Sequence, residues 1–201
     1  MKLARDGYAA IFYVLAASVL LALASKYTLA ATLPVFLLVL WFFRDPERTP
    51  DGVGYVSPAD GKVIEIYETE HPYTGKAVKI GIFMNAFSVH VNRMPSAGTV
   101  EYLEYAPGAK WFANAPKASS INERMYIGYS SERGRVMLVQ IAGLLARRIV
   151  CRLKKGDSLE RAERFGMIKL GSKVDVYLPV GTQVKVGIGQ KVSAGKTIIA
   201  G

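Results

Sequence analysis

Two uncharged apolar segments near the N-terminus constrain the fold of this chain most strongly. They cover residues 8–25 and 28–43, and Lys26 lies between them. Their lengths of 18 and 16 residues lie at or just below the ~20 residues that a helix needs to cross a bilayer. We therefore predict that residues 1–43 form a hydrophobic anchor, either a tight helical hairpin or an embedded re-entrant pair.

Basic residues flank this anchor. Lys2 and Arg5 precede the first apolar segment, and Arg44 and Arg48 follow the second. The positive-inside rule then predicts that both ends are cytoplasmic, with the remaining domain on the cytoplasmic side of the cell membrane. A cleaved signal peptide and a buried core helix are the alternatives. A second apolar segment and the lack of a clear small-residue cleavage site argue against the signal peptide.

The charge balance suggests an anionic partner. The net charge is +10, which suits lipid headgroups or nucleic acid. Next to an apolar anchor we favour a membrane partner and expect no nucleic acid, because the basic stretch over residues 147–155 lacks interleaved aromatic residues. Cys151 is the one cysteine, which excludes an intrachain disulfide and a multi-cysteine metal site. We expect no metal.

Residues 44–201 form the second predicted domain, after a boundary rich in proline and glycine over residues 44–54. Short runs rich in β-branched residues predict a mainly β (α+β) fold with little helix outside the anchor, except around residues 158–165. The glycine-punctuated tail, residues 179–201, is similar to the closing hairpins of barrel-sandwich domains. The expected strands are residues 62–67, 77–83, 135–141, 146–153 and 173–178.

The dipeptide Gly171-Ser172 follows Leu170 and lies 30 residues from the C-terminus. It joins an unhindered carbonyl to a hydroxyl nucleophile. If a base lies nearby, Ser172 Oγ can attack the Gly171 carbonyl and convert the amide into an ester. Elimination and hydrolysis would then leave a pyruvoyl group at the new N-terminus. A glycine at a strand edge followed by an ordinary serine is the alternative.

Only two histidines are available as the base. His71 lies before a proline in a polar loop, which favours a surface turn. His90 follows a predicted core strand among apolar residues, and an imidazole there can act as a general base and acid. Asp60 lies in a Pro-Ala-Asp-Gly turn, so it either forms the turn or orients His90 in a Ser-His-Asp arrangement.

Three fragments carry a resemblance that covers residues 42–201. They are Ser57-Pro-Ala-Asp-Gly61, Phe87-Ser-Val-His-Val-Asn-Arg-Met-Pro95 and Leu170-Gly-Ser172. Together they resemble phosphatidylserine decarboxylase in its short, archaeal-type form. Further matches are Phe42-Phe-Arg-Asp-Pro46, Ala118-Ser-Ser-Ile-Asn-Glu123 and the segment over residues 140–151.

The resemblance implies a proenzyme that cleaves itself between Gly171 and Ser172. The products would be a β chain of residues 1–171 and an α chain of residues 172–201, which form a heterodimer. Ser172 would become the covalent pyruvoyl cofactor, and Asp60, His90 and Ser172 would be the catalytic residues. Longer members carry a second histidine where this chain has Arg93, so His90 would serve both processing and turnover. A higher oligomer is left open.

The pyruvoyl group would form a Schiff base with the amine of phosphatidylserine and accept the electrons released with CO2, leaving phosphatidylethanolamine. His90 would return a proton to Cα. Two alternatives stay open: an archaetidylserine decarboxylase, which acts on the same headgroup, and a non-enzymatic membrane-anchored barrel-sandwich adaptor.

Overall fold

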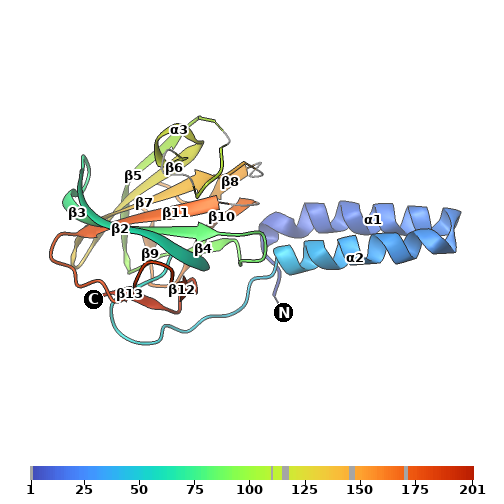
Figure 1. Cartoon of the computed structure of the whole chain (residues 1–201), viewed down its shortest axis with the longest axis horizontal. Coiled ribbons are helices and arrows are strands. Elements are labelled where there is room, and N and C mark those ends of the chain that lie inside the picture. Colours follow the sequence, from blue (N-terminus) through green and yellow to red (C-terminus); the bar gives the residue numbers. More distant parts are fainter. Residues whose placement is uncertain (1, 110, 115–117, 145–147, 170–171) are drawn as a thin grey trace. The chain divides into compact units, whose positions relative to one another are not determined.

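The computed structural model describes residues 2–109, 111–114, 118–144, 148–169 and 172–201. Within it, the chain divides into two compact units, Met1–Glu47 and Arg48–Gly201. The first unit contains the two long helices, and the second contains the strands and one short helix (Figure 1).

The N-terminal unit consists of a short 3-10 turn η1 (Arg5–Gly7) and two helices, α1 (Tyr8–Ala24) and α2 (Lys26–Phe42), which lie side by side (Figure 1). Ser25 interrupts the helices with an extended backbone, and its Oγ accepts a hydrogen bond from Tyr27 N. The segment Arg5–Leu23 is long and apolar enough to cross a membrane, and Tyr27–Phe42 is shorter. Both helices expose many apolar side chains, as helices in contact with lipid do.

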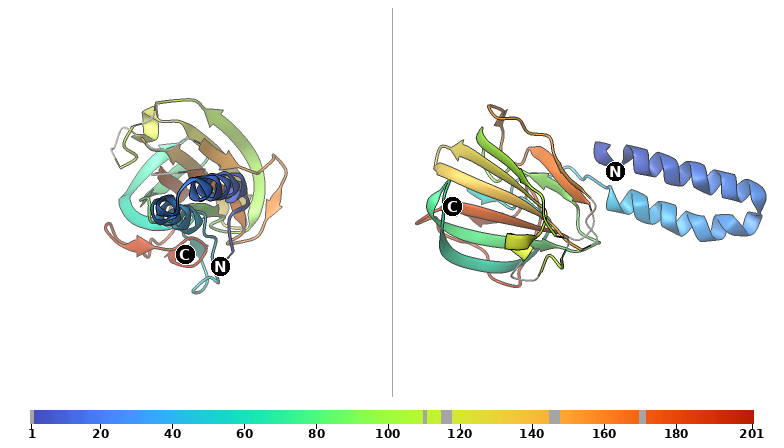
Figure 2. Two further views of the ribbon diagram at one scale, coloured as in Figure 1. Left: turned by 90° about the vertical axis from the view of Figure 1, so that its right-hand side faces the viewer. Right: turned by 90° about the horizontal axis from the view of Figure 1, so that it is seen from above.

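The C-terminal unit is built on an antiparallel eight-stranded sheet with the order β12-β2-β3-β11-β7-β6-β5-β9. A three-stranded sheet, β4-β10-β8, and a two-stranded sheet, β1-β13, accompany it. The strands curl around the core (Figure 2). The bounds are β1 (Tyr55–Val56), β2 (Gly61–His71), β3 (Gly75–Met84), β4 (Val91–Arg93), β5 (Gly98–Ala106), β6 (Arg124–Ser131), β7 (Gly134–Ala142), β8 (Arg148–Cys151), β9 (Ser158–Leu159), β10 (Arg164–Lys169), β11 (Ser172–Pro179), β12 (Lys191–Val192) and β13 (Ile198–Ala200), with one short helix, α3 (Ala118–Ile121).

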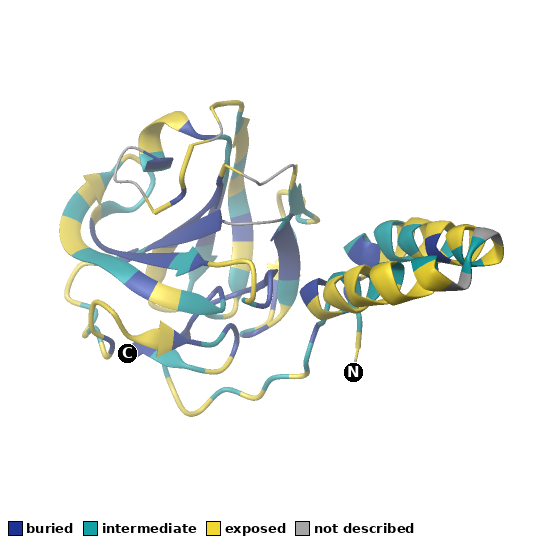
Figure 3. Ribbon diagram, turned by 45° about the vertical axis from the view of Figure 1, so that its right-hand side comes forward, coloured by how far each residue is buried: buried dark blue, intermediate teal, exposed yellow. Residues whose placement is uncertain are grey.

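The core follows from the alternation of side chains along the strands. On β11, Val174, Val176 and Leu178 point into the apolar core, whereas Lys173 and Asp175 lie on the opposite face. Figure 3 shows the buried residues concentrated in the central strands. The prediction of a mainly β domain with apolar helices at the N-terminus is confirmed.

One predicted element is wrong. Residues 158–165 do not form a helix, because β9, a turn and the start of β10 occupy this segment. Ala162 in the turn has a φ of 67°, which a right-handed helix does not allow. Its N–H donates to Met94 O, and Leu159 pairs with Gly98. Pairing with distant strands therefore overrides the local helix propensity.

Candidate functional site

Ser172 is the first residue of β11, the strand that lies between β3 and β7 in the large sheet. It pairs with Met84 on one side and with Ala142 on the other. Its side chain is fully buried, and Oγ has no hydrogen-bond partner among the described residues. Leu170 and Gly171 lie outside the described residues. A buried hydroxyl at the start of a central strand is therefore held beside the predicted cleavage point.

The end of the sheet at Ser172 collects segments that are far apart in the sequence. β3 ends at Met84 and β7 ends at Ala142, the two residues that pair with Ser172, and Lys62 near the start of β2 pairs with Phe83, one residue before Met84. Asp60 directly precedes this start of β2. It is therefore two strands away from Ser172, a separation of about 10 Å in the backbone.

The three-stranded sheet, β4-β10-β8, connects His90 to this end of the large sheet. It is fully buried in the connection between β3 and β4. Its carbonyl accepts a hydrogen bond of 3.4 Å from the N–H of Ile168 in β10, and β10 leads into the predicted cleavage dipeptide. His71 ends β2 at the opposite end of the sheet, where its ring lies 4.9 Å from that of Tyr177. His90 is therefore the histidine nearer to Ser172.

Both carboxylate oxygens of Asp60 accept hydrogen bonds. The donor to Oδ1 is the N–H of Ala194 at 2.7 Å, and the donor to Oδ2 is Arg48 Nη2 at 3.0 Å. Asp60 therefore ties the C-terminal tail and the chain before β1 to the start of β2. Each oxygen keeps a second lone pair, so these contacts leave capacity for a further donor.

In the sequence resemblance, Arg93 takes the position of a second histidine. It ends β4, is buried, and donates from Nη1 to Ala162 O at 3.1 Å. Arg93 pairs with Arg164 at the start of β10, whereas His90 contacts Ile168 near its end. The guanidinium thus stabilises the turn between β9 and β10. Along β10, the contact of Arg93 lies further from Ser172 than the contact of His90 does.

A buried polar pair that sequence reasoning missed lies between these elements. Gln140 Nε2 donates to Asn92 Oδ1 at 2.8 Å, and Asn92 Nδ2 lies 3.5 Å from Pro58 O. Both side chains are fully buried. The pair links β7, β4 and the turn before Asp60. The amide of Gln140 within an otherwise apolar run was the signal that could have indicated it.

A buried ionic cluster, made of Glu65, Lys79, Lys173 and Asp175, lies on the other face of the sheet. Lys173 Nζ lies 2.7 Å from Glu65 Oε1 and 3.1 Å from Asp175 Oδ1. Lys79 Nζ lies 2.8 Å from Glu65 Oε2 and 3.0 Å from Asp175 Oδ2. Gly81 leaves room for the cluster, since a Cβ there would lie 2.8 Å from Lys173 Cε.

The pKa shifts in the ionic cluster keep it charged. Burial alone would raise the pKa of Glu65, but the hydrogen bonds and positive charges of Lys173 and Lys79 outweigh it and bring the pKa below its usual value. Burial alone would lower the pKa of Lys79, yet the charge of Asp175 and the hydrogen bond to Glu65 hold it above its usual value. Sequence reasoning missed this cluster, although charges at alternate positions of a predicted strand were a visible signal.

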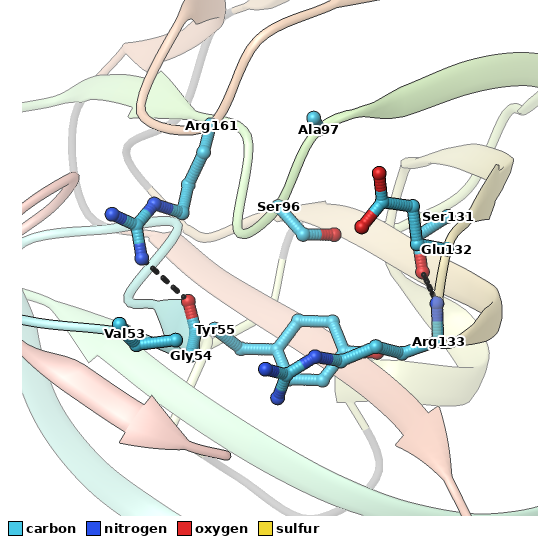
Figure 4. Close-up of a pocket in the computed structure, with 9 residues that line it drawn as sticks. All are labelled: Val53, Gly54, Tyr55, Ser96, Ala97, Ser131, Glu132, Arg133 and Arg161. Carbon is cyan, nitrogen blue, oxygen red and sulfur yellow. Dashed lines mark hydrogen bonds between the residues drawn. The ribbon is translucent and has the colours of Figure 1, made fainter.

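A pocket of about 220 Å³ lies at the opposite end of β7 from Ser172 (Figure 4). Arg161 Nη1 donates to Gly54 O there at 3.1 Å. This pocket is separate from the Ser172 end, since β7 runs from the β6–β7 turn at the pocket to Ala142 beside Ser172. It is lined by Val53, Gly54, Tyr55, Ser96, Ala97, Ser131, Glu132, Arg133 and Arg161.

Comparison with known proteins shows the family of the chain. A family model described as phosphatidylserine decarboxylase matches residues 35–200. A phosphatidylserine decarboxylase proenzyme of Nitratidesulfovibrio vulgaris is 53% identical over 174 residues, which cover 83% of this chain and 80% of that protein. One of Solidesulfovibrio magneticus is 46% identical over 205 residues, 98% of this chain and 95% of that protein. The chain therefore belongs to the phosphatidylserine decarboxylase family, a family of carboxy-lyases.

Proposed function

We propose that this protein is the self-cleaving proenzyme of a decarboxylase that converts phosphatidylserine into phosphatidylethanolamine and CO2. Cleavage takes place between Gly171 and Ser172, and Ser172 becomes the pyruvoyl group. The observation that carries the proposal is the buried Ser172 hydroxyl, which has no partner among the described residues at the start of β11. An ordinary buried serine satisfies its hydroxyl, so an unsatisfied one supports a reactive role.

The cleavage follows from the chemistry of serine. Ser172 Oγ loses its proton to a base and attacks the carbonyl carbon of Gly171, and the C–N bond breaks to give an ester and a free amine. Removal of the Cα proton then expels the Gly171 carboxylate from Cβ. The resulting dehydroalanine tautomerises to an imine, and water hydrolyses it to a pyruvoyl group and ammonia.

His90 is the base that we propose for this attack. It is buried, and its backbone contacts the strand that leads to the dipeptide. Burial keeps water away from the imidazole, and a neutral imidazole is the form that accepts a proton. Asp60 orients His90 in this proposal, and its position at the same end of the sheet as Ser172 supports the role.

In turnover, the pyruvoyl group that Ser172 would carry at the start of β11 would supply the electron sink for decarboxylation. The chain itself supplies the environment of this reaction. The surrounding strands exclude water from the start of β11, and His90 delivers the proton that replaces CO2 on the substrate Cα. The same imidazole thus serves processing and turnover, with Arg93 held in a structural contact.

The anchor gives this reaction a location. We propose that residues 1–43 attach the protein to the cell membrane and that residues 44–201 form the catalytic domain on the cytoplasmic side. Phosphatidylserine is a bilayer lipid, and the apolar segment Arg5–Leu23 is long enough to hold the protein at its substrate. Cleavage then yields a β chain of residues 1–171 and an α chain of residues 172–201.

Expression of the full chain and of Ser172→Ala tests the proposal. We expect the purified wild type to separate into two chains on a denaturing gel. In a vesicle assay, we expect it to release CO2 from phosphatidylserine. Ser172→Ala runs as one chain and releases none. A wild type that decarboxylates without cleavage, or a Ser172→Ala variant that stays active, would contradict the proposal. Archaetidylserine vesicles in the same assay show whether the chemistry of the lipid tails matters.

A further inference from the structure

Five exposed apolar side chains surround the end of the sheet where Ser172 lies. We name this set the apolar rim: Phe87, Trp111, Phe112, Ile121 and Leu144, which are 69%, 43%, 55%, 40% and 47% exposed. Single exposed apolar residues are ordinary on a protein surface, but a cluster marks an interaction site. Three separate segments supply the rim, so it is a property of the fold rather than of one loop.

The strand register brings two of these segments to Ser172. Met84 and Ala142 pair with Ser172 on its two sides, so the backbones of β3 and β7 lie about 10 Å apart there. Phe87 follows Met84 by three residues, and Leu144 follows Ala142 by two. Both residues therefore lie just beyond the strand ends that flank Ser172.

Asn122 fixes the third segment to the same place. This fully buried side chain donates from Nδ2 to Ala142 O at 2.7 Å and to Trp111 O at 2.9 Å. Its Oδ1 accepts from Trp111 N at 3.1 Å. Trp111 is thus tied to the residue that pairs with Ser172. Its ring centroid lies 5.9 Å from that of Phe112, in an edge-to-face contact.

Charge and composition identify the partner. Arg148 of β8 and Lys169 of β10 pair in register, and Lys169 precedes Ser172 by three residues. Glu123 is the acidic residue next to Asn122. Tryptophan and phenylalanine beside lysine and arginine are typical of surfaces that enter the headgroup region of an anionic bilayer.

We propose that the apolar rim docks into the surface of an anionic bilayer and so brings Ser172 to the headgroup plane. The proposal rests on the proposed function for the identity of the substrate, whose amine and carboxylate lie in that plane. The rim would let the headgroup reach the start of β11 while the acyl chains remain in the bilayer.

The two tryptophans of the chain, Trp41 and Trp111, provide a direct test. Trp41→Phe leaves Trp111 as the only tryptophan of the full-length protein. After reconstitution into vesicles of phosphatidylcholine and phosphatidylglycerol, the emission of Trp111 is expected to shift to the blue and to be quenched by brominated lipids. Trp111→Phe, which reports on Trp41 in the anchor, is the matched control.

The proposal is wrong if Trp111 stays accessible to aqueous iodide and is not quenched by brominated lipid. A blue shift that depends on protein concentration in detergent would instead indicate a second copy of the chain as the partner and would also overturn it. If Trp111 is unquenched while the protein still cleaves itself and decarboxylates, the rim proposal fails and the proposed function stands.

A charge placed on the rim gives a second readout. Phe112→Asp is expected to lower the ratio of the rate on vesicles to the rate on dispersed short-chain phosphatidylserine by about tenfold, because burying a phenylalanine is worth at least that factor. Val180→Asp is the matched control, since Val180 is 54% exposed and follows the opposite end of β11. An equal ratio in both variants would contradict the proposal.

Discussion

At the scale of single residues, the two histidines offer a matched pair of variants. His90 is buried at the Ser172 end of the sheet, and His71 lies at the opposite end beside Tyr177. We expect His90→Ala to block self-cleavage, because the Ser172 hydroxyl then has no imidazole to take its proton. His71→Ala is expected to cleave normally. The measurement is the fraction of cleaved chain on a denaturing gel, and normal cleavage of His90→Ala would remove it from the base role.

Single residues also show what the sequence could not supply. The turn at Asp60 and the burial of His90 followed from local sequence. The partners of Asp60 did not, because Arg48 and Ala194 reach it from segments before β1 and near the C-terminus. Similarly, no local signal indicates that the Arg93 guanidinium donates a hydrogen bond to Ala162 O. Contacts of this kind depend on how distant segments meet.

At the scale of elements, the ionic cluster makes β2, β3 and β11 depend on one another. It holds two lysines against two carboxylates within the described part of the sheet, with Lys79, Lys173 and Asp175 almost completely buried. We expect Lys79→Met to destabilise the fold by about 3 to 5 kcal/mol, because removal of one partner leaves uncompensated buried charge. Thermal unfolding in detergent measures the effect. Lys76→Met, which changes an exposed lysine at the start of the same strand, is the control. Equal melting temperatures would contradict the prediction.

The pH dependence of stability follows from the same cluster. The pKa of Glu65 lies below its usual value of 4.5, so its stabilisation is complete above that value and is lost as the pH falls through the pKa in the folded protein. The pKa of Lys79 lies above its usual value of 10.5, so its stabilisation is complete below that value and is lost at higher pH. We therefore expect melting temperatures of Glu65→Gln and the wild type to differ at neutral pH and to converge on acidification. A constant difference down to low pH would contradict this account.

Elements differ in how well the sequence predicted them. The alternation in residues 173–178 and the apolar runs in residues 77–83 and 135–141 carry a clear period, and these became parts of β11, β3 and β7. Residues 158–165 have no such period, and their conformation is set by pairing with β5 and β4. The prediction of a helix in that segment was therefore wrong.

At the scale of the whole molecule, the position of β11 determines what cleavage does to the assembly. β11 begins the proposed α chain, and it pairs along its length with β3 and also pairs with β7. We expect the α chain to stay bound after cleavage, since its release would break two strand ladders and expose the core residues of β11. Both chains should co-elute in gel filtration in detergent and separate only in denaturant. Loss of the small chain without denaturant would contradict this prediction.

The most direct test of the central claim is the intact mass of the small chain from the wild-type protein. If Ser172 becomes a pyruvoyl group, the fragment has the mass of residues 172–201 less one ammonia molecule, and its N-terminus is blocked to Edman degradation. A fragment with an unmodified Ser172 at a free N-terminus would show hydrolysis without cofactor formation. That result, or cleavage at another bond, would contradict the account.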